Sequence, residues 1–417
     1  MDYVGAREYI KGLNSRGISP GLNSITQLLK ELNNPQNSLK FIHIAGTNGK
    51  GSVGAYLSSV LTAEKKKVCR FVSPCVGEYL NTFLLNGKPI DKKTYVDAAK
   101  SVKSAIEVTE KRGVFPTSFE AETAIAFVLF SRLEPDYAII ECGMGGRLDA
   151  TNVIPPPVAA VITKIALDHT AFLGNTIEEI AKEKAGIIKN GTKVVTTCEN
   201  ESVLNILKEK AKETNSELYI SPNPSNIKYS RDFTFFDLYH NMFKTKMLGT
   251  YQPQNASLAI TVARALGISF DAIKRGISEA SWDFRFEKIN KFILDGAHNP
   301  DGAKELARSI KTYYGDKLVT YIFGCFADKD YGQIIDIVYP YADTVYCVTA
   351  PTPRGLSSKI IAEEFTSRGV KPIECQSIFD AILYASKHSD VVIFGTLSIL
   401  SQAKDLIERN FTNATMQ

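Results

Sequence analysis

A short glycine-rich stretch between two apolar segments constrains this chain more than any other part of its sequence. Residues 41–44 are apolar and partly β-branched, which predicts a buried strand, and residues 52–62 carry apolar residues at helical spacing. A strand, a glycine-rich loop and a helix N-terminus in this order are typical of a phosphate-binding loop, because backbone N–H groups and the helix dipole attract an anion. The loop residues are Gly46, Thr47, Asn48, Gly49, Lys50, Gly51 and Ser52.

The side chains of the loop support this interpretation, although its spacing is unusual. Lys50 would neutralise phosphate charge, and the Ser52 hydroxyl would bind Mg²⁺. Only two residues separate Gly46 from Gly49, which is fewer than in the common pattern, and Gly51 separates Lys50 from Ser52. The alternative is a glycine turn that only ends a strand.

Composition indicates a globular protein of more than one domain. The chain has 417 residues, of which 44% are hydrophobic and 23% charged, so about two or three domains are expected. A net charge of +4 is too small to predict a nucleic-acid partner. No apolar run of about 18 residues and no signal pattern is present, so we expect a cytoplasmic protein without a membrane span. The seven scattered cysteines lack a CxxC pair and suggest reduced core thiols.

Two regions of alternating strands and helices predict two α/β domains. The first has strands at 68–72, 137–141 and 158–163, and its helices include 2–12, 22–32, 93–112, 118–133, 254–266 and 270–280. Residues 227–248 alternate loosely and predict a hairpin or meander. The second region has strands at 291–295, 318–324, 343–349 and 390–395. We therefore expect a P-loop-type, mainly parallel sheet domain with helices on both faces over residues 1–288, and a smaller Rossmann-like domain over 289–417.

Polar residues follow several predicted strands, where parallel sheets place their functional sites. Glu141 ends a buried strand, and a carboxylate there suits Mg²⁺, although it could instead cap the following glycine turn. His169 follows the strand at 158–163 and is either structural or a ligand of a second cation. Lys184 ends a helix, so taken singly it predicts a contact with the helix dipole. The stretch 295–300 combines carboxylate, imidazole and amide groups, and Asn299 could also cap the helix that follows.

Taken together, these motifs resemble the folylpolyglutamate synthase and dihydrofolate synthase family, within the Mur ligase superfamily. The glycine-rich loop matches the family at each position, including the unusual spacing. Further matches follow in the same order along almost the whole chain, at residues 73–74, 119–120, 141–152, 167–170, 184–187, 254–256, 285–287 and 294–300.

The resemblance implies ATP-dependent amide formation. A folate-type carboxylate takes the γ-phosphoryl group of ATP, and the amino group of L-glutamate attacks the resulting acyl phosphate. Cofactors would be ATP and Mg²⁺, with two ions expected, and the substrates a folate or dihydropteroate and L-glutamate. Both a glutamyl-chain extender and an enzyme that also makes dihydrofolate fit these residues. Neither nucleic acid nor membrane is an expected partner, and we expect a monomer.

Site residues carry over position by position. Gly46 to Ser52 would hold the ATP phosphates, with Lys50 catalytic. The matching nucleotide positions in the rest of the chain are Asn255, Arg285 and Asp295. Metal positions are Ser52, Ser73, Glu141 and His169, together with Lys184, which matches a lysine that is carbamylated in the family. The substrate positions are His298 and Thr396 near glutamate, where His298 is also a catalytic candidate, and Thr117 and Phe119 near the pterin.

Three local departures from the family pattern stand out. Cys75 replaces a frequent histidine, and residues 77–79 replace a usual Asn-Glu-Arg run, both in the loop expected near the pterin. Residues 283–284 replace the Pro-Gly that often precedes the residue at Arg285.

Two other functions fit the sequence less well. A Mur ligase acting on a UDP-linked muramoyl peptide needs an N-terminal domain for the UDP-sugar, but only 45 residues precede Gly46, and they predict two short helices. A P-loop ATPase that is not a ligase gives no reason for the site at 295–300.

Overall fold

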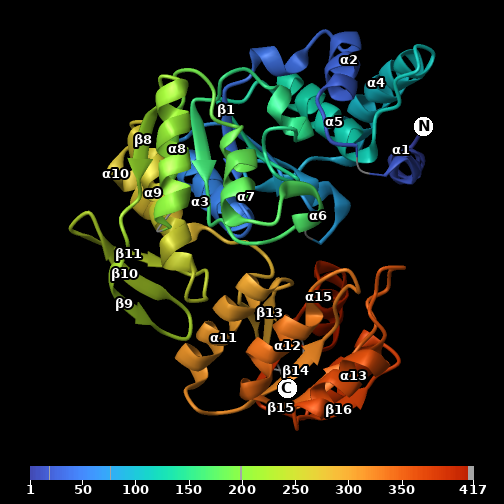
Figure 1. Cartoon of the computed structure of the whole chain (residues 1–417), viewed down its shortest axis with the longest axis vertical. Helices are drawn as coiled ribbons and strands as arrows, with labels where there is room; N and C mark the ends of the chain where they lie inside the picture. Colours follow the sequence, from blue (N-terminus) through green and yellow to red (C-terminus); the bar gives the residue numbers. More distant parts are fainter. Residues whose placement is uncertain (18, 76, 198–199, 412–417) are drawn as a thin grey trace. The chain divides into compact units, whose positions relative to one another are not determined.

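The chain forms two compact units in the computed structural model, which describes residues 1–17, 19–75, 77–197 and 200–411 (Figure 1). Unit 1 comprises Met1–Cys75, Tyr79–Asn223 and Gln254–Ala280. Unit 2 comprises Pro224–Pro253 and the chain from Ser281 onward, together with a short segment at 77–78. Among the described residues, no helix is both long and apolar enough to span a membrane.

Unit 1 is built on an eight-stranded, mainly parallel sheet with the order β4-β3-β2-β5-β1-β6-β7-β8. The predicted strand before the glycine-rich loop is β1 (Phe41–Ala45), which pairs in parallel with β5 (Tyr137–Glu141) and β6 (Ala159–Ile162). The loop and Glu141 therefore leave the sheet at the same edge. The remaining strands are β2 (Val68–Phe71), β7 (Lys193–Thr196) and β8 (Glu217–Ile220), all parallel, and the antiparallel β3 (Phe83–Leu85) and β4 (Lys88–Pro89).

Helices cover both faces of this sheet, as predicted. On one face, Phe41 and Ile140 share a core with α1, α2, α4 and α5, and Ile162 and Val194 share one with α7 and α8. Because side chains alternate along a strand, Arg70 and Glu141 lie on the opposite face, with α3. The helices are α1 (Tyr3–Gly12), α2 (Asn23–Glu31), α3 (Lys50–Ala63), α4 (Lys92–Glu110), α5 (Ser118–Leu133), α6 (Thr170–Leu173), α7 (Ile177–Ala185), α8 (Glu201–Glu213), α9 (Gln252–Ala265) and α10 (Phe270–Glu279).

Unit 2 is a second α/β layer structure, as the alternating pattern predicts. Its six-stranded sheet has the order β12-β13-β17-β14-β15-β16, and all strands except β12 run parallel. The strands are β12 (Glu287–Ile289), β13 (Phe292–Asp295), β14 (Val319–Phe323), β15 (Ala342–Cys347), β16 (Lys371–Glu374) and β17 (Val391–Phe394). The helices are α11 (Pro300–Tyr314), α12 (Tyr331–Val338), α13 (Ser358–Ser367), α14 (Ile378–Ala385) and α15 (Leu397–Phe411).

The predicted meander is a three-stranded antiparallel sheet that groups with unit 2. Its strands are β9 (Ser225–Tyr229), β10 (Thr234–Leu238) and β11 (Asn241–Thr245). The rings of Tyr229 and Tyr313 lie 5.7 Å apart, and the Thr250 N–H group donates to Ser309 Oγ (3.0 Å), so α11 holds this region. The two compact units divide between residues 280 and 281, and unit 2 also includes residues 224–253. The domain boundary that the sequence analysis places between residues 288 and 289 stays a prediction.

The described cysteines are free thiols, in agreement with the composition. Five of them are buried, namely Cys69, Cys142, Cys325, Cys347 and Cys375, and Cys75 is half-buried. Cys198 lies outside the described residues.

Close contact between α3 and α10 generates a stability prediction. A methyl group at Gly276 would lie 2.3 Å from the Cα atom of Val60, so Gly276→Ala must push the two helices apart. We expect a loss of about 1–3 kcal/mol of stability, seen as a fall of about 3–10 °C in the thermal unfolding midpoint measured by circular dichroism.

Gly12→Ala is the matched control. Gly12 ends α1, and a methyl group there would meet nothing within 4 Å. This variant should keep or slightly raise the midpoint, because alanine restricts the unfolded chain. Equal midpoints for both variants would contradict the described helix contact.

Candidate active site

The backbone of the glycine-rich loop is fixed by hydrogen bonds to the segment that follows β6. Thr47 donates its N–H group to the Lys164 carbonyl (2.8 Å) and its hydroxyl to the Ala166 carbonyl (2.9 Å). The Thr163 hydroxyl donates to the Asn48 carbonyl (2.7 Å). In these three hydrogen bonds the loop donates twice through Thr47 and accepts once at the Asn48 carbonyl, so the loop is held in one shape.

Two glycines of the loop are required by their surroundings. A methyl group at Gly46 would lie 1.7 Å from Thr163 Oγ1, and one at Gly49 would lie 2.7 Å from Asn255 Oδ1. Gly49 also has φ of 92°, which disfavours residues with a side chain. The structure therefore brings Asn255, one of the expected nucleotide positions, directly against the loop.

Lys50 begins α3 and lies over its own loop. Its ammonium group donates to the carbonyl oxygens of Gly46 (2.8 Å) and Thr47 (3.3 Å). Burial lowers the pKa of Lys50, and the nearby Glu141 carboxylate opposes that shift. In the described part of the chain Lys50 forms no direct ion pair, so its charge is available to an anion. Ser52, two residues further along the helix, is buried.

Glu141 is bound by an arginine that the sequence analysis did not select. The Arg70 guanidinium forms a buried ion pair with Glu141 Oε1 (2.7 Å) and also donates to the Gly51 carbonyl (2.6 Å). Both side chains are only 2% exposed. One guanidinium thus joins the proposed metal carboxylate to the glycine-rich loop. A charged residue inside an otherwise apolar strand was the signal that could have identified Arg70.

The turn after Glu141 is organised by Asp149. This buried carboxylate accepts the N–H groups of Met144 (2.8 Å) and Thr151 (3.0 Å) and the Thr151 hydroxyl (2.5 Å). Burial raises the pKa of Asp149, and these hydrogen bonds oppose the shift. A methyl group at Gly143 would lie 2.6 Å from the Phe119 ring, so the turn contacts one of the expected pterin-side residues.

Thr117, the other expected pterin-side residue, caps helix α5. Its hydroxyl accepts the Glu120 N–H group (3.3 Å), and the Glu120 carboxylate accepts the Thr117 N–H group (2.7 Å). This capping box fixes the start of α5 at Ser118, one residue before Phe119, so Thr117 has a structural role besides the expected one.

Lys184 is buried at the end of α7, beside the same turn. The Arg147 N–H group donates to the Glu183 carbonyl (2.7 Å), and a methyl group at Gly146 would lie 2.9 Å from the Lys184 carbonyl oxygen. Burial lowers the pKa of Lys184 to about 7, and the positive charge of Lys50 acts in the same direction. A large fraction of this amine is therefore neutral near pH 7, so Lys184 differs from an ordinary surface lysine at a helix end.

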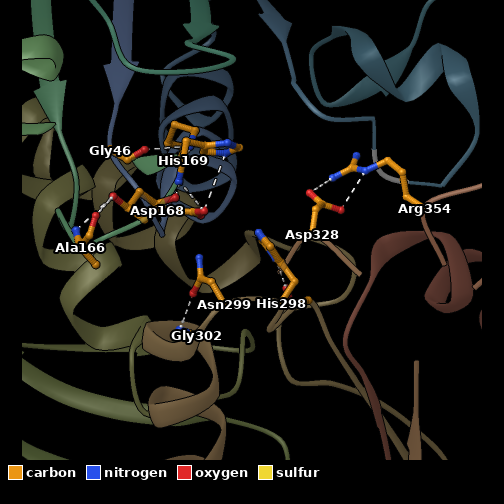
Figure 2. Close-up of polar contacts among 12 residues, drawn as sticks. Gly46, Ala166, Asp168, His169, His298, Asn299, Gly302, Asp328 and Arg354 are labelled. Carbon is orange, nitrogen blue, oxygen red and sulfur yellow. Dashed lines mark hydrogen bonds and ion pairs between the residues drawn. The ribbon is translucent and has the colours of Figure 1, made fainter. Parts of the chain in front are cut away.

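The remaining expected metal positions are more open. His169 is 46% exposed, precedes α6, and lies 4.0 Å from the Asp168 carboxylate, which accepts the His169 N–H group (2.9 Å; Figure 2). Ser73 is half-buried after β2. Within the described ranges, no three His, Cys, Asp or Glu residues are grouped closely enough to hold a metal alone. The side chains available at Ser52 and Glu141 are oxygen donors, which suit Mg²⁺ when phosphate oxygens complete its shell.

In unit 2, Asp295 is the last residue of β13, and its buried carboxylate accepts several hydrogen bonds. It accepts the Tyr251 hydroxyl (2.6 Å) and the N–H groups of Phe286 (2.9 Å) and Ala297 (2.9 Å). Burial raises the pKa of Asp295, and Tyr251 and Arg285 oppose the shift. The Arg285 guanidinium donates to the Phe284 carbonyl (3.0 Å) and lies against Gly296, so two of the expected nucleotide positions are neighbours.

The other expected residues of unit 2 lie at the same sheet edge. His298 Nδ1–H donates to the Gly296 carbonyl (2.7 Å), and Asn299 caps α11 through the Gly302 N–H group (2.8 Å; Figure 2). The Gly395 N–H group donates to the Ala297 carbonyl (3.0 Å), which places the segment before Thr396 beside the turn that carries His298.

Comparison with known proteins gives two matching domain families. The Mur ligase middle domain matches residues 44–263, and the glutamate ligase domain of Mur ligases matches residues 284–396. The dihydrofolate synthase/folylpolyglutamate synthase of Bacillus subtilis is 33% identical over 86% of this chain and 87% of its own length. The folylpolyglutamate synthase of Lacticaseibacillus casei is 32% identical over 98% of this chain and 99% of its own.

Solved structures agree with these relatives. Folylpolyglutamate synthase of Mycobacterium tuberculosis, complexed with ADP and AMPPCP, is similar with a TM-score of 0.91 and 27% identity, over 98% of this chain and all of that one. FolC of Escherichia coli, in complex with DHPP and ADP, has a TM-score of 0.87 and 27% identity over 98% of both chains. The resemblance predicted from the motifs is therefore confirmed.

The lowered pKa of Lys184 predicts a pH-dependent stability. The pKa of Lys184 is about 7 in the folded protein and higher in the unfolded chain. Above pH 7 the unfolded state therefore binds more protons than the folded state, and the contribution of Lys184 makes the protein more stable as pH rises. Lys184→Met removes the buried charge. We expect it to raise the thermal unfolding midpoint relative to the native chain at pH 6, by an amount that shrinks toward pH 9, in bicarbonate-free buffer.

Lys182→Met on the exposed side of the same helix is the control and should shift the midpoint equally at both pH values. A Lys184→Met effect that does not change between pH 6 and pH 9 would contradict the described burial of the amine.

Proposed function

We propose that this chain, which belongs to the folylpolyglutamate synthase and dihydrofolate synthase family of Mur ligases, is an ATP-dependent ligase that joins L-glutamate to the carboxylate of a folate. The observation that carries the proposal is the preformed glycine-rich loop with Glu141 and Asn255 beside it. In the reaction, a folate carboxylate oxygen bonds to the γ-phosphorus and ADP leaves. The glutamate nitrogen then bonds to the acyl carbon, phosphate leaves and the amine loses a proton.

The loop supports this reaction through charge. Two anionic reactants must approach each other, so positive groups must screen them. Lys50 at the start of α3 provides a fixed ammonium, and the backbone N–H groups at the helix start add favourable potential. The ATP phosphates bind along Gly46 to Ser52, and Asn255 contacts the nucleotide from the adjacent helix.

The donor set near the loop fits Mg²⁺. When bound, the metal would neutralise phosphate charge and polarise the γ-phosphoryl group. Ser52 and Glu141 would hold one ion, and Ser73, His169 and a carbamylated Lys184 would hold a second. The support for the carbamate is the buried, partly neutral amine of Lys184, because CO₂ reacts only with the neutral form.

Unit 2 supplies the remaining contacts in this proposal. Asp295 and Arg285 bind the nucleotide, and His298 and Thr396 orient the incoming glutamate. On unit 1, Thr117 and Phe119 contact the pterin end of the folate. The enzyme acts as a monomer, and dihydropteroate is a second acceptor, as several relatives are dihydrofolate synthases by name.

Phosphate release from ATP tests the function directly. The purified chain should release phosphate only when both L-glutamate and tetrahydrofolate or dihydropteroate are present, and testing each acceptor separately determines whether both are used. Lys50→Ala should lower kcat about 100-fold or more, because one electrostatic stabiliser is lost at the transferred group.

Lys40→Ala is the matched control. This exposed lysine immediately precedes the first residue of β1, whereas the glycine-rich loop follows the last. It should retain native turnover. Phosphate release that needs neither acid nor glutamate would contradict a ligase, and native turnover in Lys50→Ala would contradict the assignment of the loop.

The proposed carbamate makes Lys184 sensitive to a change that preserves charge. Lys184→Arg keeps a cation but cannot form the adduct, so turnover should fall at least 100-fold. Lys184→Ala should also be weak, and acetate should partly restore it by supplying oxygen ligands. Mass spectrometry of the native chain in bicarbonate should show added CO₂.

Lys182→Arg is the control on the same helix and should remain active. Full activity of Lys184→Arg would show that no carbamate is required.

A further inference from the structure

Arg70 is a buried arginine within a strand that is otherwise apolar. Its Nη2 and Nε atoms donate to the same Glu141 oxygen, Oε1, at 2.7 and 3.2 Å, and Nη2 also donates to the Gly51 carbonyl (2.6 Å). The side chain is 2% exposed. An arginine in such a place loses its hydration, so its partners must be well aligned to compensate.

Sheet register explains the alignment. β2 and β5 are parallel, with Arg70 opposite Ile139, and the alternation of side chains places Glu141 on the same face two residues later. Helix α3 covers this face and provides room through Gly54, where a methyl group would lie 2.8 Å from Arg70 Nε. The guanidinium therefore connects β2, β5 and the first turn of α3.

This arrangement affects any cation that Glu141 binds. Both hydrogen bonds that Arg70 donates to Glu141 go to Oε1, and within the described residues none reaches Oε2. The carboxylate is thus held in a fixed orientation in the absence of metal, but a positive charge stays next to it. Orientation would strengthen metal binding by restricting one side chain, whereas repulsion between a guanidinium and a divalent cation a few ångströms away weakens it more.

We propose that Arg70 is a positioning residue that sets the affinity of the metal site. It keeps Glu141 buried and aligned in the metal-free protein, and it weakens the hold of Glu141 on a divalent cation, so that the metal can leave with the product nucleotide. The proposal rests on the proposed role of Glu141 as a Mg²⁺ ligand. If Arg70 were only structural, its loss would weaken metal binding and stability together.

The test measures Mn²⁺ binding to the full-length chain, with ADP at one fixed concentration in every sample, by the electron paramagnetic resonance signal of free Mn²⁺. Thermal unfolding is measured with EDTA or with MnCl₂. Arg70→Leu should lower the unfolding midpoint in EDTA, because Glu141 loses its partner, and should bind Mn²⁺ about tenfold more tightly. Arg70→Lys keeps the positive charge but loses the paired hydrogen bonds of the guanidinium. The Kd of this variant for Mn²⁺ should stay within about threefold of the native value.

Three further variants make the result decisive. Arg70→Gln replaces Arg70→Leu if the latter does not fold, with the same expectation. Arg368→Leu, which removes a forked arginine from Asp336 and Glu364 in unit 2, should leave the Kd unchanged. Glu141→Gln should abolish the Mn²⁺ site, and unchanged binding there would refute the metal assignment itself. If Glu141→Gln abolishes the Mn²⁺ site, the uncharged Arg70 variants decide the proposal. A Mn²⁺ Kd that falls by less than about threefold in these variants, or that rises, overturns it.

Discussion

The site in unit 1 depends on the hydrogen bonds that fix the glycine-rich loop to the end of β6. Thr47 and Thr163 occupy carbonyl groups on both sides of the join, and Gly46 permits the close approach. With the loop fixed, α3 must begin at Lys50, and its N–H groups point to where a phosphate would bind. The positions of Glu141 and Asn255 are tied to this loop, because Arg70 joins Glu141 to the Gly51 carbonyl and Asn255 lies against Gly49.

Strands that are buried on both faces could be predicted from sequence, because they appear as short apolar runs. The strand at 137–141 and the helix at 118–133 have the predicted bounds. The edge strands β8 and β16 were not predicted, because their side chains are half-buried or exposed and show no apolar alternation. Placement of the meander with unit 2 depends on contacts to α11, which no local pattern reveals.

Motifs that carry several groups at once predicted the loop, Glu141 and Asp295 as site residues, and their roles stay predictions. Taken singly, Lys184 was interpreted as a helix-end contact, because burial cannot be read from one lysine. Only the family resemblance predicted it as a metal position. Contacts between residues far apart in the chain were not predicted from the sequence. Tyr251 bonds to Asp295 across 44 residues of chain, and Arg70 bonds to Glu141 across 71. Only the pairing of strands and the packing of helices bring such partners together.

The absence of a side chain at Gly54 links two distant positions in the sequence. An alanine there would occupy the place of the Arg70 guanidinium, since its methyl group would lie within 3.0 Å of three guanidinium atoms. Substitutions at the two positions are therefore not independent. In relatives with an arginine at the position of Arg70 on β2, we expect glycine at the position of Gly54 on α3. In relatives with an aliphatic residue on β2, alanine or serine should be tolerated on α3. Covariation between these two columns of an alignment would be the evolutionary record of a single buried charge.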